Sequence, residues 1–237
     1  MRFPIYLLLT VISVGLSGSV KAQGIFDLGT ITQAISKGND AQAAQQQAGI
    51  TTPQKVADIS AFNFTPSLEL RKSNMSKFIA GMKQLNPEAG AQMEQGLAGI
   101  DVMNEMQKTV TPLGLNVNNL ADAYVIYFMN AWTGANGITD TPTAAQVAGT
   151  KDMVYASFGS SADLAKLSND DKQNTAEAFI LQAVLFDLFA QAAASEPKVK
   201  AKVESDIRAG AKTMGIDVDQ YAMTPNGLVR KTAPQKK

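Results

Sequence analysis

Residues 118–132 read NNLADAYVIYFMNAW, and this stretch decides the fold. From Leu120 onward, apolar side chains occupy nearly every side of a helix instead of one face. Such a distribution is typical of a helix that is surrounded by other helices. We therefore predict a central buried helix here. Gly134 and Gly137 follow the stretch and are expected to end the helix.

Helix starts can be recognised on the N-terminal side of this stretch. Thr65–Pro66 provides an N-cap followed by proline at the first helical position, and it predicts a helix over residues 66–85. Asn86–Pro87 repeats the pattern and predicts a second helix. Asp101 is suited to cap a third helix, which is expected to end before Pro112.

The C-terminal side is also helical by the same signals. Thr141–Pro142 is expected to begin one helix, Ser168 with Asp171 resembles a capping box, and Pro197 begins another helix. No segment alternates with period two, and no Asn-Gly or Asp-Gly turn lies between β-branched runs. We therefore predict an all-α fold, a single-domain bundle of about seven helices over residues 63–229 around the central apolar helix.

The first residues have the layout of a secretory signal peptide. Arg2 gives a positive start, Ile5–Leu16 an apolar middle and Val20–Ala22 a small-residue exit, so residues 1–22 are predicted to be removed. An uncleaved anchor helix is the alternative, but it needs about 20 continuous apolar residues, and small and polar residues begin already at Gly15. We expect a periplasmic or secreted protein with no stable membrane span after signal removal.

Two further segments differ from the helical domain in composition. Residues 23–62 are rich in Ala and Gln, as in the run Ala41–Ala48, and either a solvated helix or a partly flexible leader fits them. Residues 230–237 contain Pro234 and four cations, which predicts a flexible basic tail.

The composition excludes many functions. The 21 Lys and Arg residues balance the 21 Asp and Glu residues, so the charge gives no reason to expect nucleic acid as a partner. The sequence contains no Cys and no His, which removes disulfides, thiol nucleophiles, imidazole bases and the usual zinc ligands. No segment has the spaced oxygen ligands and the turn glycine of an EF-hand calcium loop either. We expect no metal site and no cofactor, and we favour binding over catalysis.

Short motifs spread over the chain resemble a known family. They are Thr65–Ser67, Arg71, Asn74, Gly114–Leu115, Asn119–Tyr124, Ala131–Trp132, Gly137, Lys172–Gln173, Ala176–Glu177, Gly210–Lys212, Met214–Asp217 and Met223–Val229. Their joint order is similar to that of DUF6683, a bacterial family of exported proteins of unknown function. The resemblance covers about residues 64–230 and leaves the leader outside. It implies an all-α exported domain, and it brings no activity, ligand or catalytic residue.

Two carboxylates are the candidates for catalysis. Glycosidases need only an Asp or Glu pair about 5 to 10 Å apart, so this chemistry remains open without His. Asp122 is the first candidate because its helix is otherwise apolar, and Glu177 is the second because its helix should pack nearby. The alternative is structural, with Asp122 accepting hydrogen bonds from a helix start or from an Arg such as Arg71, or lying in a helical first turn. We favour the structural interpretation.

Aromatic residues of the central helix are the candidates for ligand binding. Tyr124, Tyr127 and Trp132 recur at helical spacing and could line a pocket for a sugar or peptide, and Arg71 is a candidate cation. Core packing is the alternative, and it is the usual role of aromatic side chains at this spacing.

Three functions remain open on the sequence. The favoured hypothesis is a noncatalytic binding or interaction module of the bacterial cell envelope, with an envelope protein or a cell-wall component as its partner. A carboxylate-dependent hydrolase of envelope glycan is the first alternative. A small-molecule carrier with an apolar pocket of aromatic and Met side chains is the second, because the chain contains 10 Met residues.

Overall fold

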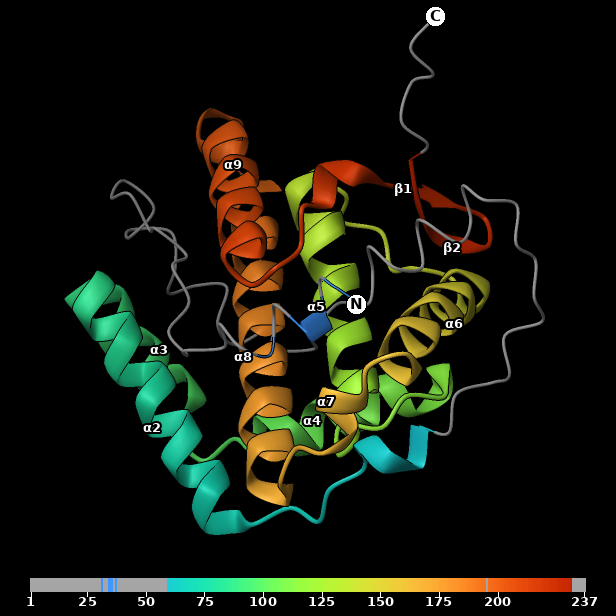
Figure 1. Cartoon of the computed structure of the whole chain (residues 1–237). Helices are drawn as coiled ribbons and strands as arrows, with labels where there is room; N and C mark the ends of the chain where they lie inside the picture. Colours follow the sequence, from blue (N-terminus) through green and yellow to red (C-terminus); the bar gives the residue numbers. More distant parts are fainter. Residues whose placement is uncertain (1–30, 32–33, 36, 38–58, 195, 232–237) are drawn as a thin grey trace, which may run out of the picture.

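The computed structural model describes residues 31, 34, 35, 37, 59–194 and 196–231 (Figure 1). These residues contain eight α-helices and one two-stranded antiparallel sheet, so the all-α prediction is confirmed apart from a small hairpin. The elements are α2 (Leu68–Leu85), α3 (Pro87–Leu97), α4 (Val102–Val110), α5 (Leu120–Ala135), α6 (Ala144–Gly159), α7 (Ala162–Ala165), α8 (Asn169–Ala194), α9 (Pro197–Thr213), β1 (Tyr221–Thr224) and β2 (Gly227–Arg230).

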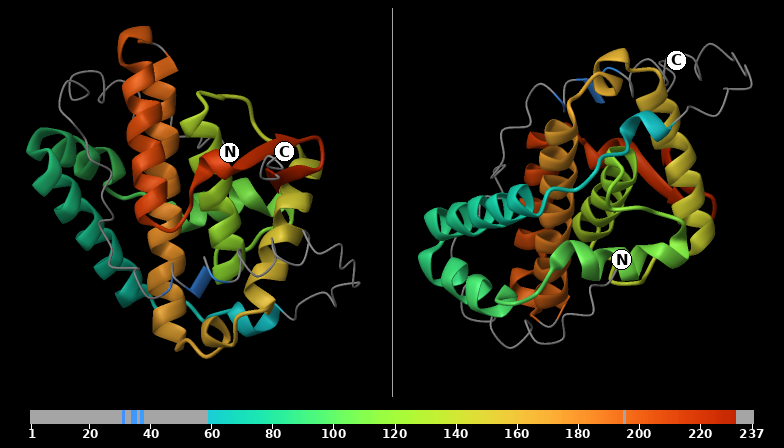
Figure 2. Two further views of the ribbon diagram at one scale, coloured as in Figure 1. Left: turned by 45° about the horizontal axis from the view of Figure 1, so that its top comes forward. Right: turned by 90° about the horizontal axis from the view of Figure 1, so that it is seen from below.

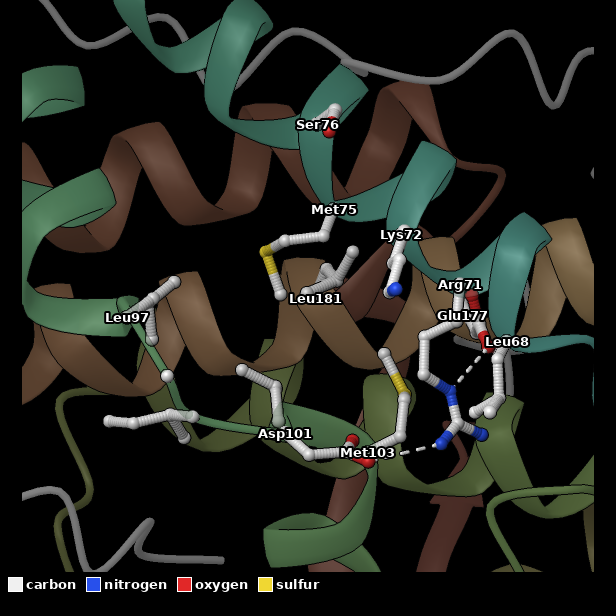
Figure 3. A pocket seen from close by; sticks show the side chains of 13 residues that line it. Leu68, Arg71, Lys72, Met75, Ser76, Leu97, Asp101, Met103, Glu177 and Leu181 are labelled. Carbon is white, nitrogen blue, oxygen red and sulfur yellow. Dashed lines mark hydrogen bonds and ion pairs between the residues drawn. The ribbon is translucent and has the colours of Figure 1, made fainter.

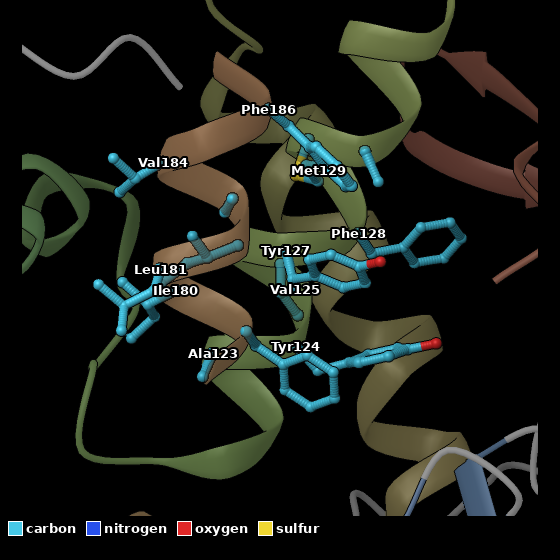
Figure 4. Close-up of a cluster of buried hydrophobic side chains, with 14 of the residues drawn as sticks. Ala123, Tyr124, Val125, Tyr127, Phe128, Met129, Ile180, Leu181, Val184 and Phe186 are labelled. Carbon is cyan, nitrogen blue, oxygen red and sulfur yellow. The ribbon is translucent and has the colours of Figure 1, made fainter. Parts of the chain in front are cut away.

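The helix α5 is the central helix that the sequence predicts. Every residue of α5 except Trp132 is buried, and the helix packs against α8, α9 and α6. Figure 4 shows side chains of α5 and α8 meeting in the core, where the ring centroids of Tyr127 and Phe186 lie 5.8 Å apart. Phe179 of α8 contacts the rings of both Tyr124 and Tyr127. These two helices therefore form the centre of the bundle.

The helix α8 is the one helix in the described part of the chain that is long and apolar enough to cross a membrane. However, 78% of its apolar window is buried inside the protein, where it packs against α5, α9 and α2. A helix that is apolar on all sides is expected in the core of a bundle as well as in a bilayer. The contacts of α8 account for its composition.

The remaining helices surround this pair. The helices α2 and α3 pack against each other beside α8, whereas α6 lies on the opposite side of the molecule, next to α5 (Figures 1 and 2). The helix α4 lies across the lower part of the bundle in Figure 1, and α9 packs against both α5 and α8. This arrangement places α2, α4 and α8 around one common face.

Several of the predicted helix starts are confirmed. The Asn86 side chain accepts a hydrogen bond from the backbone of α3, and Asp101 does the same for α4. Ser168 accepts from the backbone N–H of Asp171 at the start of α8. Pro197 stands at the first position of α9. These starts were predictable because the cap and the helix it serves are adjacent in sequence.

Two predicted helix starts are wrong by two residues each. The cap of α2 is Ser67 and not Thr65, and the cap of α6 is Thr143 and not Thr141. Thr65 is held elsewhere, because its N–H donates to Asn169 Oδ1 at 2.8 Å. Thr143 forms a reciprocal capping box with Gln146. In both cases proline stands next to two Thr or Ser residues, and contacts beyond the local sequence decide which one caps.

The C-terminal hairpin is a feature that the sequence analysis missed. Strands β1 and β2 are joined through Pro225 and Asn226, and Gly227 has a φ of +101°. The strand β2 packs on α6, where the Leu228 N–H donates to Thr150 Oγ1 at 2.9 Å. Neither four-residue strand alternates regularly between buried and exposed side chains, so the period-two pattern that predicts a strand is missing. The Asn226–Gly227 pair therefore belongs to a hairpin that lacks the flanking pattern by which such hairpins are predicted.

The core includes residues that precede the predicted domain boundary at residue 63. Ile35 and Phe62 are buried in the same apolar cluster as α5 and α8, and Phe62 packs edge-on against Phe158 of α6. The predicted signal peptide, the run Ala41–Ala48 and residues 232–237 of the predicted tail lie outside the described residues.

Candidate functional site

A groove lies between α2, the segment that joins α3 to α4, and α8. Its volume is about 590 Å³, a size typical of small-molecule sites. Figure 3 shows Met75 and Met103 reaching into it, with Leu181 between them. Further apolar lining comes from Leu68, Leu97, Ile100 and Val102. The groove is therefore apolar over most of its surface.

An ionic cluster forms one end of this groove. Arg71 of α2 donates from Nε to Glu177 Oε1 at 3.1 Å and from Nη1 to Asp101 Oδ2 at 3.4 Å (Figure 3). Glu177 is buried, and it also accepts from Asn74 Nδ2 at 2.8 Å and from Gln173 Nε2 at 2.9 Å. A buried carboxylate with one cation and two neutral donors is fully satisfied. The cluster thereby ties α2 to α8 and to the start of α4.

The same contacts explain why the chain is fixed at this end of the groove. The side chain of Gln173 donates to the Ser67 carbonyl and accepts from the Ser67 N–H, both at 2.8 Å. The side chain of Asn169 forms the same reciprocal pair with the backbone of Thr65. The first turns of α8 therefore position the start of α2, from which Arg71 extends.

The structure places Asp122 in a different cluster from Glu177. The Asp122 carboxylate accepts from the Tyr155 hydroxyl of α6 at 2.5 Å and from the Asn116 N–H at 2.9 Å. Burial raises the pKa of Asp122 above its usual value, although the bonds from Tyr155 and Asn116 and the nearby Lys151 act in the opposite direction. The two candidate carboxylates thus have separate partners, and only Glu177 lines the groove.

The candidate aromatic residues lie in the core or beside it. Tyr124 and Tyr127 are buried between α5 and α8, and neither belongs to the lining of the groove. Burial raises the pKa of Tyr127 well above its usual value, with a further contribution from Tyr124. Trp132 is partly buried and donates from Nε1 to the carbonyl of Tyr221 in β1 at 3.1 Å. Of the four candidate binding residues, the groove contains Arg71.

Sequence reasoning missed most of the groove. In the sequence, Met75 has the spacing of an ordinary apolar helix face, and Lys72 is an exposed cation with no motif around it. Lys72 lines the groove and has no hydrogen-bond or ion-pair partner among the described residues. No local signal identifies such a site, because its walls come from segments about 100 residues apart along the chain, as the Arg71–Glu177 pair illustrates.

Two other features of the described residues are weaker candidates for a site. No group of three or more acidic side chains among these residues is placed to hold a metal ion. A second hollow, near the C-terminal end of α5, has a volume of only about 10 Å³, which is room for one water molecule at most. The groove beside α2 is thus the candidate functional site.

Comparison with known proteins identifies a family. No curated protein and no solved structure matches the chain significantly. A family of unknown function, DUF6683, matches residues 20–231. The match begins at residue 20, so the prediction that the leader lies outside the family pattern is wrong. Since the matched region covers most of the sequence, the chain belongs to the family of unknown function DUF6683.

Proposed function

We propose that this protein is an exported, noncatalytic binding module of the bacterial cell envelope, and that the groove between α2, α4 and α8 is its binding site. The observation that carries the proposal is the groove itself, with a volume of about 590 Å³ and a mostly apolar lining. Leu68 lies in this lining and is 69% exposed to solvent. An apolar concavity with a few polar groups at one end is the usual form of a binding site.

The state of the carboxylates supports binding over catalysis. An acid or base catalyst must exchange a proton with the substrate at hydrogen-bond distance. The oxygens of Glu177 are occupied by Arg71, Asn74 and Gln173. Asp122 does not line the groove. The two carboxylates that the glycan hydrolase hypothesis names, Asp122 and Glu177, therefore do not meet at this site. The second carboxylate of the groove, Asp101, accepts from Arg71 and caps α4 through the Asn104 N–H.

Site-specific photocrosslinking tests the proposal. A photoreactive amino acid replaces Leu68 in the full-length protein, which is expressed in bacterial cells and irradiated. Leu85 provides a matched control, because it is another exposed leucine of α2 and does not line the groove. Gel shifts and intact-mass changes are then measured on the purified protein and on envelope fractions.

The expected result is an adduct from position 68 and a much weaker one from position 85. A protein partner appears as a gel shift, and a small partner appears as an added mass. Equal labelling at the two positions, or no adduct at either while the protein remains folded, contradicts the assignment of the groove as the binding site. The export part of the proposal is tested separately by the mass of the purified protein, which should correspond to a chain beginning at Gln23.

A further inference from the structure

We infer that the groove binds a single-chain amphiphile with a negatively charged head, namely a fatty acid, and that Lys72 pairs with its carboxylate. This inference rests on the proposed function and specifies the ligand of the same site. It follows from three properties of the lining: its size, its lack of aromatic rings and the distribution of its charges.

The size of the groove favours a small molecule over a protein segment. Pockets of about 300 to 1,000 Å³ bury most of the surface of a ligand of drug-like size, and this groove has about 590 Å³. A stable protein interface generally buries more than about 1,000 Å² in total, which requires a more extended surface. A docked helix from another protein is therefore the less favoured occupant.

The side chains of the groove favour a flexible aliphatic chain. None of the described residues that line it is aromatic, so a sugar ring or a base finds no aromatic face among them on which to stack. Its walls are instead built from Leu, Ile, Val and Met side chains. Met75 and Met103 both point into the space (Figure 3). Methionine side chains adapt to irregular apolar ligands because they are unbranched and have three rotatable bonds.

The four charged side chains of the groove sum to zero, but they differ in whether they already have a partner. Arg71 is already shared by the two carboxylates of the lining, Glu177 and Asp101. Lys72 is the neighbouring cation, and it has no ion-pair partner among the described residues. In Figure 3 its amine lies between Arg71 and Met75, beside the apolar part of the groove. The amine is therefore available to pair with an anion whose apolar chain lies against Met75 and Leu181.

Displacement of a fluorescent probe tests this inference on the purified mature protein. The uncharged probe N-phenyl-1-naphthylamine is bound first. Three ligands that share one alkyl chain then compete with it below their micelle concentrations: dodecanoate, dodecanol and dodecyltrimethylammonium. The variants are Lys72→Gln and, as a matched control, Lys77→Gln. Lys77 is an exposed lysine of the same helix that does not line the groove. Met75→Trp is added to fill the groove.

The expected affinity order for the wild-type protein is dodecanoate, then dodecanol, then the cation. An exposed ion pair contributes at most about a factor of five in affinity, so Lys72→Gln should weaken dodecanoate by about threefold to fivefold. It should leave dodecanol unchanged, and Lys77→Gln should change neither. Met75→Trp should weaken all three ligands, and circular dichroism shows whether each variant is folded.

Other outcomes overturn the inference and separate it from the proposed function. Equal binding of the three ligands, with no effect of Lys72→Gln, shows that the groove has no preference for an anionic head. The groove would then be an apolar site without charge selectivity. Undiminished binding to a folded Met75→Trp variant shows that the ligands bind outside the groove. If no ligand binds but position 68 still crosslinks to a protein partner, the fatty acid is excluded while the groove remains a binding site.

Discussion

At the scale of single residues, the two tyrosines Tyr127 and Tyr155 differ in what their hydroxyls bind. Tyr127 is buried and its hydroxyl has no hydrogen-bond partner among the described residues. The hydroxyl of Tyr155 donates to the Asp122 carboxylate. A buried polar group without a partner costs stability, whereas a hydrogen bond to a charged group adds about 1.5 to 3 kcal/mol. The same substitution should therefore act in opposite directions at the two positions.

We predict that Tyr127→Phe leaves the free energy of unfolding unchanged or raises it by about 1 kcal/mol, because it removes a desolvated hydroxyl and keeps the ring. We predict that Tyr155→Phe lowers it by about 1.5 to 3 kcal/mol at neutral pH. Urea unfolding followed by circular dichroism measures both values. A loss at Tyr127 as large as that at Tyr155 would show that the Tyr127 hydroxyl has a stabilising partner.

The sequence identifies most residues of the ionic cluster, but it does not predict that they contact one another. Arg71, Asn74, Gln173 and Glu177 all occur in the motifs on which the family resemblance rests. The sequence analysis gives Arg71 as one possible donor to Asp122, whereas the structure pairs Arg71 with Glu177 and Asp101. Which carboxylate an arginine reaches depends on how two distant helices pack, and periodicity gives no information on that.

At the scale of elements, the contact of α6 with the hairpin depends on two glycines. A Cβ atom on Gly149 would lie 1.7 Å from the Asn226 carbonyl oxygen. Gly227 faces it, with a φ of +101°, and a Cβ there would lie 2.5 Å from the backbone nitrogen of Thr150. Both obstacles are backbone atoms, which cannot rotate away as a side chain can. The hairpin can therefore approach α6 this closely only because neither residue has a side chain.

We predict that Gly149→Ala destabilises the protein, although Gly to Ala inside a helix normally stabilises it by about 0.5 to 1 kcal/mol. The hairpin should be displaced from α6. Trp132 is the single tryptophan and donates to Tyr221 at the start of the hairpin, so its fluorescence emission should shift to the red. Val229→Thr is the control, because Val229 is exposed on β2 and its replacement should change neither stability nor emission. An unshifted emission together with a gain in stability would refute the close packing.

The accuracy of the predicted elements follows the range of the interactions that define them. The caps of α3 and α4 depend on a side chain three residues away, and they were predicted correctly. The cap of α2 depends on Asn169 and Gln173 of α8, more than 100 residues away, and it was predicted wrongly. The hairpin depends on its contact with α6, and it was missed. The sequence therefore predicts a cap that depends on neighbouring residues. It does not predict which of two similar residues will cap when a contact from a distant helix decides.

At the scale of the whole molecule, the architecture was predictable because one segment is apolar on all sides. Such a segment requires partners on every side, and α8, α9 and α6 provide them. The groove was not predictable, because it is the space left where α2, α4 and α8 meet. The existence of a core can be predicted from the apolar content of the helices. The existence of a groove depends on small differences in how the helices are placed, which the sequence does not give.

The whole molecule should also show an unusual dependence of stability on pH. The chain contains no His, so no imidazole titrates between about pH 5 and pH 8. Burial of the Asp122 carboxyl group raises its pKa above the usual value of 3.8. An acid with a raised pKa in the folded state retains its proton longer than in the unfolded state. Its contribution to stability is therefore fully present below 3.8 and is lost as the pH rises through the raised pKa.

We predict that Asp122→Asn removes this dependence, because the amide has no proton to lose. As the pH falls toward about 4, the wild type should become more stable relative to the variant. The gain in unfolding free energy should be about 1.4 kcal/mol for each unit by which the pKa of Asp122 is raised. Urea unfolding of both proteins at steps from about pH 4 to about pH 8 measures this difference. Subtracting the two curves cancels the remaining carboxylates, which both proteins share. A difference that stays constant with pH, or that favours the wild type at higher pH, would mean that the bonds from Tyr155 and Asn116 outweigh burial at Asp122.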